Sequence, residues 1–233
     1  MINIQSAVKD FSTWLKQIKF IIWDLDGTLY PTNAELKEKI NLKATELIAQ
    51  TKKITLAEAQ RLRINLYQEL NSMTRVLIAT GVDRAYAQSG EWYGQIQWDS
   101  IKPNPQLVKS LKAVKHAQHI ICTNSNQQSA EDKLEKIGFR LSDFYAVIGT
   151  PDKIGVLKPD VKVYQYLLDL TQAEPAEHLF VGDRYETDLA SAHKIGMKTA
   201  LVYEEDDRAD LNYASLEALL LAFNCKSHDT YWT

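Results

Sequence analysis

The chain has 233 residues, a hydrophobic content of 45% and a formal net charge of −3 at pH 7. This length fits one large domain, or a core domain with a smaller insertion, and the hydrophobic content can build a packed core. The charge balance lacks the basic footprint of a nucleic-acid-binding protein, and no apolar run approaches the roughly 20 residues of a membrane-spanning helix. Because the N-terminus also lacks the apolar region of a signal peptide, we expect a cytoplasmic protein.

The first segment, residues 1–19, carries apolar residues on one helical face, namely Ala7, Phe11, Trp14, Leu15 and Ile18. This spacing predicts a short helix packed on the core. A helix lying on a membrane surface is the alternative, which the few lysines of this short segment do not favour.

A short apolar run follows, Phe20 to Trp23, and it leads into Asp24, Asp26, Gly27 and Thr28. Its β-branched and aromatic residues predict a buried strand. Asp24 then lies at the carboxyl end of that strand, where open α/β sheets bind ligands. One of the two acids could act as a nucleophile and the other could transfer a proton. Taken alone, the pattern is also compatible with a polar turn.

The block from residue 31 to residue 101 shows helical periodicity and no convincing strand. Two capping boxes, Thr32-Asn33-Ala34-Glu35 and Thr55-Leu56-Ala57-Glu58, mark helix starts. We therefore predict an all-helical cap at residues 31–101, inserted into an α/β core formed by residues 1–30 and 102–233. Candidate substrate contacts in the cap are Arg75, Arg84, Tyr86, Trp92 and Tyr93, although aromatic residues of a small helical bundle are more often part of its core.

After Pro105 the sequence alternates regularly between helices and strands. Strands are predicted near 119–123, 145–148, 178–182 and 198–202, with helices between them. Asp210 is expected to cap a last helix whose inner side carries Leu216, Leu219, Leu220 and Phe223. Such alternation implies a doubly wound, Rossmann-like parallel sheet with helices on both faces. Cys122 falls inside an apolar strand, so we expect a buried thiol and no disulfide framework with Cys225.

Polar residues recur where the predicted strands end. Thr123 and Asn124 follow one strand, Asp183 follows another, and Asp188 and Lys158 lie in neighbouring segments. In a parallel sheet these points share one edge with Asp24. Crowded carboxylates call for a cation, and Mg²⁺ suits a site that also takes a phosphate oxygen. A lysine and a hydroxyl suit a phosphoryl group. Each residue alone could be an ordinary loop residue, but their joint occurrence predicts a phosphoryl-transfer site.

These clusters resemble the four motifs of the haloacid dehalogenase-like (HAD) superfamily, in the same order, and they span Asp24 to Asp188. The helical block resembles the cap of one large phosphatase subgroup, with a weak similarity to pyrimidine 5′-nucleotidase-like members. The resemblance implies a nucleophile that forms an aspartyl-phosphate, Asp24, and a general acid and base, Asp26. It also implies phosphate contacts from Thr123, Lys158 and Asn124, the last also as a backbone-orienting residue. The implied Mg²⁺ ligands are Asp24, the backbone carbonyl of Asp26, Asp183, and Asp188 directly or through water.

The resulting expectation is a Mg²⁺-dependent phosphatase of a small phosphorylated metabolite, such as a nucleotide, a sugar phosphate or phosphoglycolate. A phosphomutase would use the same two acids, Asp24 and Asp26. A haloacid dehalogenase would not need Asp26. A phospho-acceptor domain or an inactive binding protein would leave the helical insertion and the complete motif set unexplained. Neither a nucleic-acid polymer nor a membrane is expected as a partner, and the oligomeric state is left open.

Overall fold

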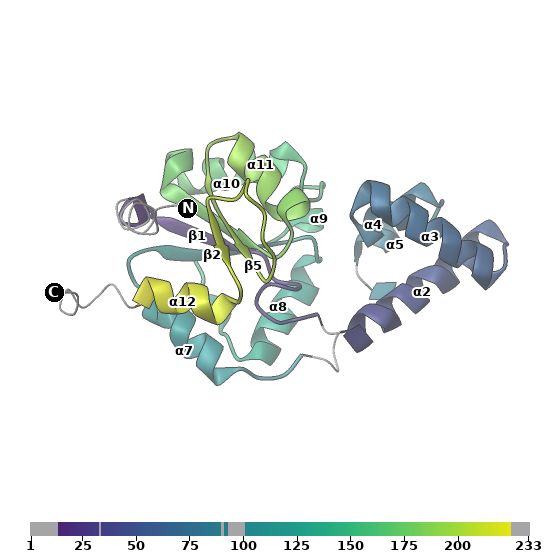
Figure 1. The fold of residues 1–233 in the computed structure, drawn as a ribbon, viewed down its shortest axis with the longest axis horizontal. Coiled ribbons are helices and arrows are strands. Elements are labelled where there is room, and N and C mark those ends of the chain that lie inside the picture. Colours follow the sequence, from purple (N-terminus) through teal and green to yellow (C-terminus); the bar gives the residue numbers. More distant parts are fainter. Residues whose placement is uncertain (1–13, 33, 90, 93–100, 225–233) are drawn as a thin grey trace.

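The computed structural model describes residues 14–32, 34–89, 91–92 and 101–224. Its α/β lobe is built on a six-stranded sheet of order β3-β2-β1-β4-β5-β6 (Figure 1). Every neighbouring pair of strands is parallel. The strands are β1 (Phe20–Trp23), β2 (Gln118–Thr123), β3 (Ala146–Gly149), β4 (His178–Gly182), β5 (Lys198–Val202) and β6 (Leu211–Tyr213). The predicted doubly wound α/β fold is confirmed.

Strand β1 lies inside the sheet and is buried along its whole length. Its last residue, Trp23, pairs with Ile121 of β2 on one side and with Val181 of β4 on the other. The chain thus returns to opposite sides of β1, which makes the carboxyl end of β1 a switch point of the sheet. Ligands of open α/β sheets bind at such points, because the connecting loops diverge there and leave a crevice.

Helices cover both faces of the sheet. One core cluster packs α7 (Pro105–Ala113), α8 (Gln127–Ile137) and α12 (Leu216–Asn224) on one face, and another packs α10 (Val161–Thr171) and α11 (Ala190–Lys194) on the opposite face (Figure 1). Short elements complete the lobe: the 3₁₀ helices Leu141–Asp143 and Pro175–Glu177, α9 (Thr150–Lys153), and the π-helical turn Tyr185–Leu189 before α11. The apolar side of each helix packs on the sheet, so the strands are buried between two layers of helices.

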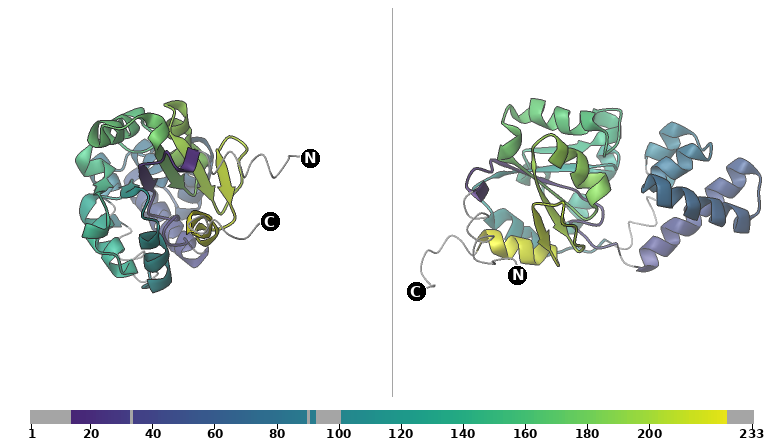
Figure 2. Two further views of the ribbon diagram at one scale, coloured as in Figure 1. Left: turned by 90° about the vertical axis from the view of Figure 1, so that its left-hand side faces the viewer. Right: turned by 45° about the horizontal axis from the view of Figure 1, so that its top comes forward.

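In the described part of the insertion, four helices with defined bounds lie in a second lobe beside the α/β lobe (Figures 1 and 2). They are α2 (Ala34–Lys52), α3 (Leu56–Leu70), α4 (Met73–Ala79) and α5 (Arg84–Ser89). Their own apolar cluster contains Ile48, Val76 and Leu77. The predicted capping box at Thr55 and Glu58 is present, whereas Asn33 of the other box lies outside the described residues. The described part of this insertion contains no strand, and its predicted boundaries at 31 and 101 stay a prediction.

The prediction for Asp210 is wrong. Its side chain caps no helix, because it accepts hydrogen bonds from the backbone N–H and the hydroxyl of Thr199 and pairs with Lys198 Nζ at 3.0 Å. The short strand β6 then intervenes, and the hydroxyl of Ser215 accepts the N–H of Ala218 at the start of α12. The inner side of α12 is as predicted, with Leu216, Leu219, Leu220 and Phe223 buried.

Near the N-terminus, Leu15 and Ile18 are buried in the core and Trp14 packs against it. Ala7 and Phe11, which belong to the same predicted helix, lie outside the described residues, as does Cys225. Cys122 is buried in β2, as expected. Within the part of the chain that the structure describes, no helix combines the length and the apolar character needed to cross a membrane.

Candidate active site

Asp24 lies at the carboxyl end of β1 with both carboxylate oxygens engaged. Lys158 Nζ is 2.7 Å from Oδ1, and the hydroxyl of Thr28 donates to Oδ2 at 2.9 Å. The backbone N–H of Asp24 donates to the carbonyl of Val181 at 2.9 Å, which extends the β1–β4 pairing to this residue. Burial raises the pKa of Asp24 to about 6, with Lys158 opposing the shift and the charge of Asp188 adding to it. The carboxylate is thus held in one orientation beside a fixed cation.

Lys158 bridges two acids from the centre of the site. Its buried Nζ lies 2.7 Å from Asp24 Oδ1 and 2.8 Å from Asp188 Oδ1. Burial alone would lower the pKa of Lys158, but Asp188 and Asp24 outweigh it and raise this pKa well above its ordinary value. Lys158 is therefore charged, and it offsets part of the negative charge that the carboxylates bring together.

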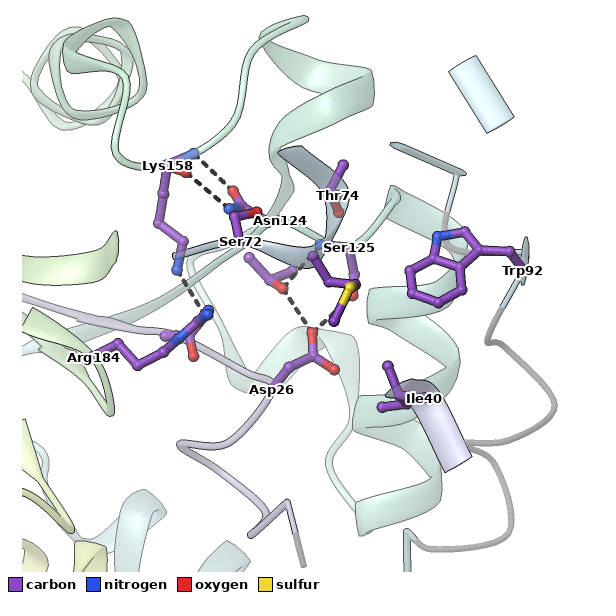
Figure 3. A pocket seen from close by; sticks show the side chains of 12 residues that line it. Asp26, Ile40, Ser72, Thr74, Trp92, Asn124, Ser125, Lys158 and Arg184 are labelled. Carbon is purple, nitrogen blue, oxygen red and sulfur yellow. Dashed lines mark hydrogen bonds and ion pairs between the residues drawn. The ribbon is translucent and has the colours of Figure 1, made fainter. Parts of the chain in front are cut away.

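Asn124 fixes the backbone that carries Lys158. Its Oδ1 accepts the N–H of Lys158 at 2.8 Å, and its Nδ2 donates to the carbonyl of Lys158 at 3.0 Å (Figure 3). The hydroxyl of Thr150 also donates to Asn124 Oδ1, at 3.0 Å. Of the two roles expected for Asn124, this geometry favours the orientation of the backbone over contact with phosphate.

Three carboxylates form a cluster that fits a cation. One oxygen each of Asp24, Asp183 and Asp188 lies within 4.8 Å of the others. Among the buried side-chain nitrogen and oxygen atoms of the described residues, Asp183 Oδ1 is the one without a hydrogen-bond partner, and it forms a long ion pair with Arg184 Nε at 3.9 Å. Burial raises the pKa of Asp183 to about 7, with the charges of Asp188 and Asp24 as the next causes. A buried carboxylate oxygen without a donor, beside two further carboxylates, is the donor set that a hard divalent cation takes.

Two glycines allow this crowding. Gly27 has a φ of +99°, and a Cβ on it would lie 2.5 Å from Asp183 Oδ2. A Cβ on Gly182 would lie 2.5 Å from the Cβ of Asp188. Any side chain at these positions would displace one of the acids, because such contacts are far shorter than van der Waals distance. The glycines are therefore part of the site although they contribute no side chain.

The side chain of Asp26 stands apart from this acidic cluster. Its Oδ1 accepts from Lys133 Nζ at 2.6 Å and from the hydroxyl of Tyr30, and its Oδ2 accepts from Ser125 Oγ at 2.8 Å and Thr123 Oγ1 at 3.0 Å. Burial would raise the pKa of Asp26, but Lys133, Tyr30 and Ser125 outweigh it and bring this pKa below its usual range. The two acids of the first motif therefore occupy opposite electrostatic environments.

Thr123 takes part in that network. Its hydroxyl donates to Asp26 and accepts the backbone N–H of Ser125 at 3.1 Å. The expected contact of Thr123 with a phosphate stays a prediction, as do the catalytic and ligand roles of the other motif residues. What the structure establishes is that all seven residues singled out in the sequence gather at one edge of the sheet: Asp24, Asp26, Thr123, Asn124, Lys158, Asp183 and Asp188.

A cavity of about 140 Å³ opens above these residues, between the two lobes. The α/β lobe lines it with Asp24, Asp26, Thr123, Asn124, Ser125, Lys158 and Arg184, and the helical lobe with Ile40, Ser72, Met73, Thr74 and Trp92 (Figure 3). Of the predicted cap contacts, Trp92 lines the cavity and Arg75, Arg84 and Tyr86 do not. Tyr93 lies outside the described residues. Within the described lining, the cap contributes hydroxyl and apolar groups and no charge.

The sequence reasoning gave no role to Thr28, Tyr30, Ser125, Lys133 and Arg184. For Lys133 a signal was present, since it falls in the helical row of Ala130, Leu134 and Ile137, which are all buried. A lysine on the inner side of an amphipathic helix calls for a buried partner. Arg184 follows Asp183 directly and gives no periodic signal, and it reaches the cap by donating from Nη1 to the carbonyl of Asn71 at 3.5 Å.

Residues 21–202 match the sequence model of haloacid dehalogenase-like hydrolases. The chain belongs to the haloacid dehalogenase-like hydrolase family. Among relatives of this HAD-like hydrolase is a glyceraldehyde 3-phosphate phosphatase of Methanothermobacter thermautotrophicus, 21% identical over 87% of this chain and 93% of the relative. A phosphoglycolate phosphatase of Agrobacterium fabrum is 26% identical over 73% of this chain and 74% of the relative. The crystal structure of a HAD phosphatase from Thermococcus onnurineus shares the fold, with a TM-score of 0.62 at 19% identity, covering 87% of this chain and 96% of that chain.

Proposed function

We propose that this HAD-like hydrolase is a Mg²⁺-dependent phosphatase that hydrolyses a small phosphomonoester through a phosphorylated Asp24. The observation that carries the proposal is the placement of Asp24. Its carboxylate lines the cavity, its two oxygens are held by Lys158 and Thr28, and it adjoins the acidic cluster. A carboxylate held in this way can attack a phosphorus atom without first having to be oriented.

In the proposed reaction, an oxygen of Asp24 attacks the phosphorus and the bond between phosphorus and the ester oxygen breaks. Asp26 delivers a proton to the departing alkoxide, which leaves as an alcohol. Asp26 then takes a proton from water, the water oxygen attacks the phosphorus, and inorganic phosphate is released as Asp24 is regenerated. Asp26 is placed for both proton transfers because it lines the same cavity without sharing the cation-binding cluster of Asp24.

The residues that would hold Mg²⁺ are Asp24, Asp183 and Asp188, with the backbone carbonyl of Asp26 as the ligand expected from the family resemblance. When bound, the ion would neutralise the crowded carboxylates and the charge of the phosphoryl group. Asp183 Oδ1 supports this assignment, since it accepts no hydrogen bond and its ion pair with Arg184 Nε is long, at 3.9 Å. Lys158, fixed by Asn124, would add positive charge beside Asp24 and Asp188.

Among the expected substrates, we propose one of the smaller phosphate esters. The cavity of about 140 Å³ is well below the roughly 300–1,000 Å³ of common ligand pockets. The names of the two relatives, a glyceraldehyde 3-phosphate phosphatase and a phosphoglycolate phosphatase, also point to esters of two or three carbons. These considerations favour such esters over nucleotides, whose base and ribose require more volume.

The proposal is tested by measuring phosphate release from 2-phosphoglycolate, glyceraldehyde 3-phosphate and a nucleoside monophosphate, in Mg²⁺ and in EDTA. We expect Mg²⁺-dependent release that is fastest with one of the two small esters. Release that persists in EDTA would contradict the role of the metal. Preference for the nucleotide would contradict the substrate class, and an isomerised phosphate ester without free phosphate would indicate a phosphomutase.

A further inference from the structure

Lys133 is a buried cation beside the site that the four motifs do not include. It lies on α8, and its side chain is 1% exposed. The neighbours on its helical row are apolar and buried, so Lys133 occupies a position where this helix otherwise packs Ala130, Leu134 and Ile137. A buried charge without a partner is strongly disfavoured, so the contacts of Lys133 should explain why a lysine stands at this position.

Those partners belong to the site. Lys133 Nζ lies 2.6 Å from Asp26 Oδ1 and donates to Ser125 Oγ at 2.8 Å, and Ser125 Oγ in turn donates to Asp26 Oδ2 at 2.8 Å. The lysine, the serine and the carboxylate thus form a closed triangle. Figure 3 shows Asp26 turned toward Ser125 at the wall of the cavity. A charge-assisted contact at this distance fixes both the position and the rotation of the carboxylate.

Lys133 itself does not reach the substrate side. Asp26, Thr123 and Ser125 line the cavity, and Lys133 is absent from its described lining. Its ammonium group is buried and contacts two of these lining residues, Asp26 and Ser125. These contacts give Lys133 a direct route by which it can influence a reaction in the cavity.

We propose that Lys133 is a positioning residue that, together with Ser125, holds the carboxylate of Asp26 where it can exchange a proton with the leaving group and with water. This inference rests on the proposed function, in which Asp26 is the general acid and base. Loss of Lys133 leaves the Asp26 carboxylate held by hydroxyl groups alone, so it is less firmly positioned and the steps that need proton transfer slow down. Steps that do not need a proton from Asp26 are spared.

The first test uses leaving groups that differ in their need for a proton. First-turnover rates are measured for Lys133→Met with acetyl phosphate, a small acyl ester whose acetate leaves unprotonated, and with the alkyl phosphate that the wild type hydrolyses fastest. General acid catalysis contributes about 10²–10⁴-fold, so we expect a loss of at least about tenfold with the alkyl ester and less than about threefold with acetyl phosphate. Lys133→Arg, which keeps the cation, should recover part of the loss. KM should stay close to the wild-type value, since Lys133 touches no substrate.

The second test separates positioning from a general effect on folding. If Lys133 acts through Asp26, adding Lys133→Met to Asp26→Asn lowers the alkyl-ester rate no further than Asp26→Asn alone. The double variant also removes both charges, so it leaves no uncompensated buried ion. Lys198→Met is the matched control: this lysine is paired with Asp210 and begins β5, at the edge of the sheet opposite Asp24. We expect it to keep wild-type rates with both esters.

Equal losses with both esters, further loss in the double variant, or wild-type rates in Lys133→Met would overturn the positioning role. The proposed function fails in a different way, which the wild type reveals. A wild type that releases phosphate from neither ester contradicts the phosphatase assignment and this inference together. A wild type that hydrolyses both, combined with any of the three Lys133 results above, contradicts this inference alone.

Discussion

Two aspartates two residues apart meet opposite surroundings in this molecule. Asp24 shares its side of the site with Asp183 and Asp188, and its pKa is raised to about 6 by burial in the first place. Asp26 turns to Lys133 and three hydroxyl groups, and its pKa is lowered. Two carboxyl groups whose pKa values are shifted in opposite directions can take different roles in one reaction. The separation follows from single residues, since Lys158 and Thr28 hold Asp24 whereas Lys133 holds Asp26.

Gly27 should be required because a side chain there would displace Asp183. Gly155 serves as the control, because it has the same kind of backbone strain without that contact. Gly27 and Gly155 both have positive φ, +99° and +79°, so alanine at either position is strained by about 1–2 kcal/mol. A Cβ at Gly155 meets no atom within 4 Å, whereas one at Gly27 meets Asp183 Oδ2 at 2.5 Å. We expect both variants to lose melting temperature through this backbone strain, and Gly27→Ala to lose more because its Cβ also displaces Asp183. Only Gly27→Ala should need at least about tenfold more Mg²⁺ for half-maximal phosphate release.

Equal Mg²⁺ requirements in the two glycine variants would show that Asp183 moves aside without consequence for the cation. In that case Asp183 would not be a ligand that the loop must accommodate.

The pH dependence of stability provides a test of Asp183 without any turnover. Its pKa is raised from 3.8 to about 7 in the folded protein. Between these values the folded state binds a proton that the unfolded state has released. The contribution of Asp183 to stability is therefore fully present below about pH 4 and is lost as the pH rises toward 7. In EDTA, Asp183→Asn should gain stability over the wild type steadily from pH 4 to pH 7.5, as measured by urea unfolding.

A stability difference between Asp183→Asn and the wild type that stays flat over this range would contradict the raised pKa of Asp183. The difference cancels the groups that titrate alike in both proteins, and it reports Asp183 together with Asp24, whose charge contributes to the raised pKa of Asp183.

At the scale of elements, strong local patterns were predictable and long-range pairing was not. The buried run of β1 and the capping box of Thr55 are short-range signals, and both were predicted correctly. Strand β6 has three residues and no buried one, so nothing in its sequence distinguished it from a loop. Asp210 was misassigned because its partners, Lys198 and Thr199, are 12 and 11 residues away.

The residues of the site also divide into those that the sequence predicts and those that depend on long-range contacts. The motif residues were predictable because the carboxyl ends of parallel strands meet at one edge. The link of Lys133 and Ser125 to Asp26 was not, because it spans 107 and 99 residues and depends on how the chain after β2 lies against β1; for Lys133 the sequence signalled only that a buried partner is needed. Asn124 was predictable as a site residue, whereas its hydrogen bonds to the backbone of Lys158 depend on the path of a distant loop.

The four cap helices should behave as a separate packing unit. Leu77 is fully buried in their cluster, which shares no described residue with the two clusters around the sheet. Leu77→Ala should destabilise the cap by about 2–5 kcal/mol. Limited proteolysis should then cut first between α2 and α5 and leave the α/β lobe intact. Leu42→Ala, at a position of α2 that is 56% exposed, should resist like the wild type.

Simultaneous cleavage of both lobes in Leu77→Ala would contradict this independence and would show that the two lobes unfold as one.

At the scale of the whole molecule, the chemistry and its substrate come from different lobes. The sheet gathers every charged residue of the described cavity lining, and the cap adds side chains such as Ser72, Thr74 and Trp92. The connections between them within the described chain include Arg184 to the carbonyl of Asn71 and Asn126 to the carbonyl of Ser89. This division lets the cap determine which ester fits while the core keeps the same reacting groups.

The central claim is that Asp24 becomes phosphorylated, and its most direct test is to trap that intermediate. The enzyme is mixed with Mg²⁺ and a hydrolysed ester, quenched in acid within one turnover, digested and analysed by mass spectrometry. The account predicts one added phosphoryl group on the peptide that contains Asp24. It also predicts that Asp24→Asn, correctly folded by circular dichroism, shows neither the label nor turnover. A label on another residue, or sustained turnover by Asp24→Asn, would contradict the account.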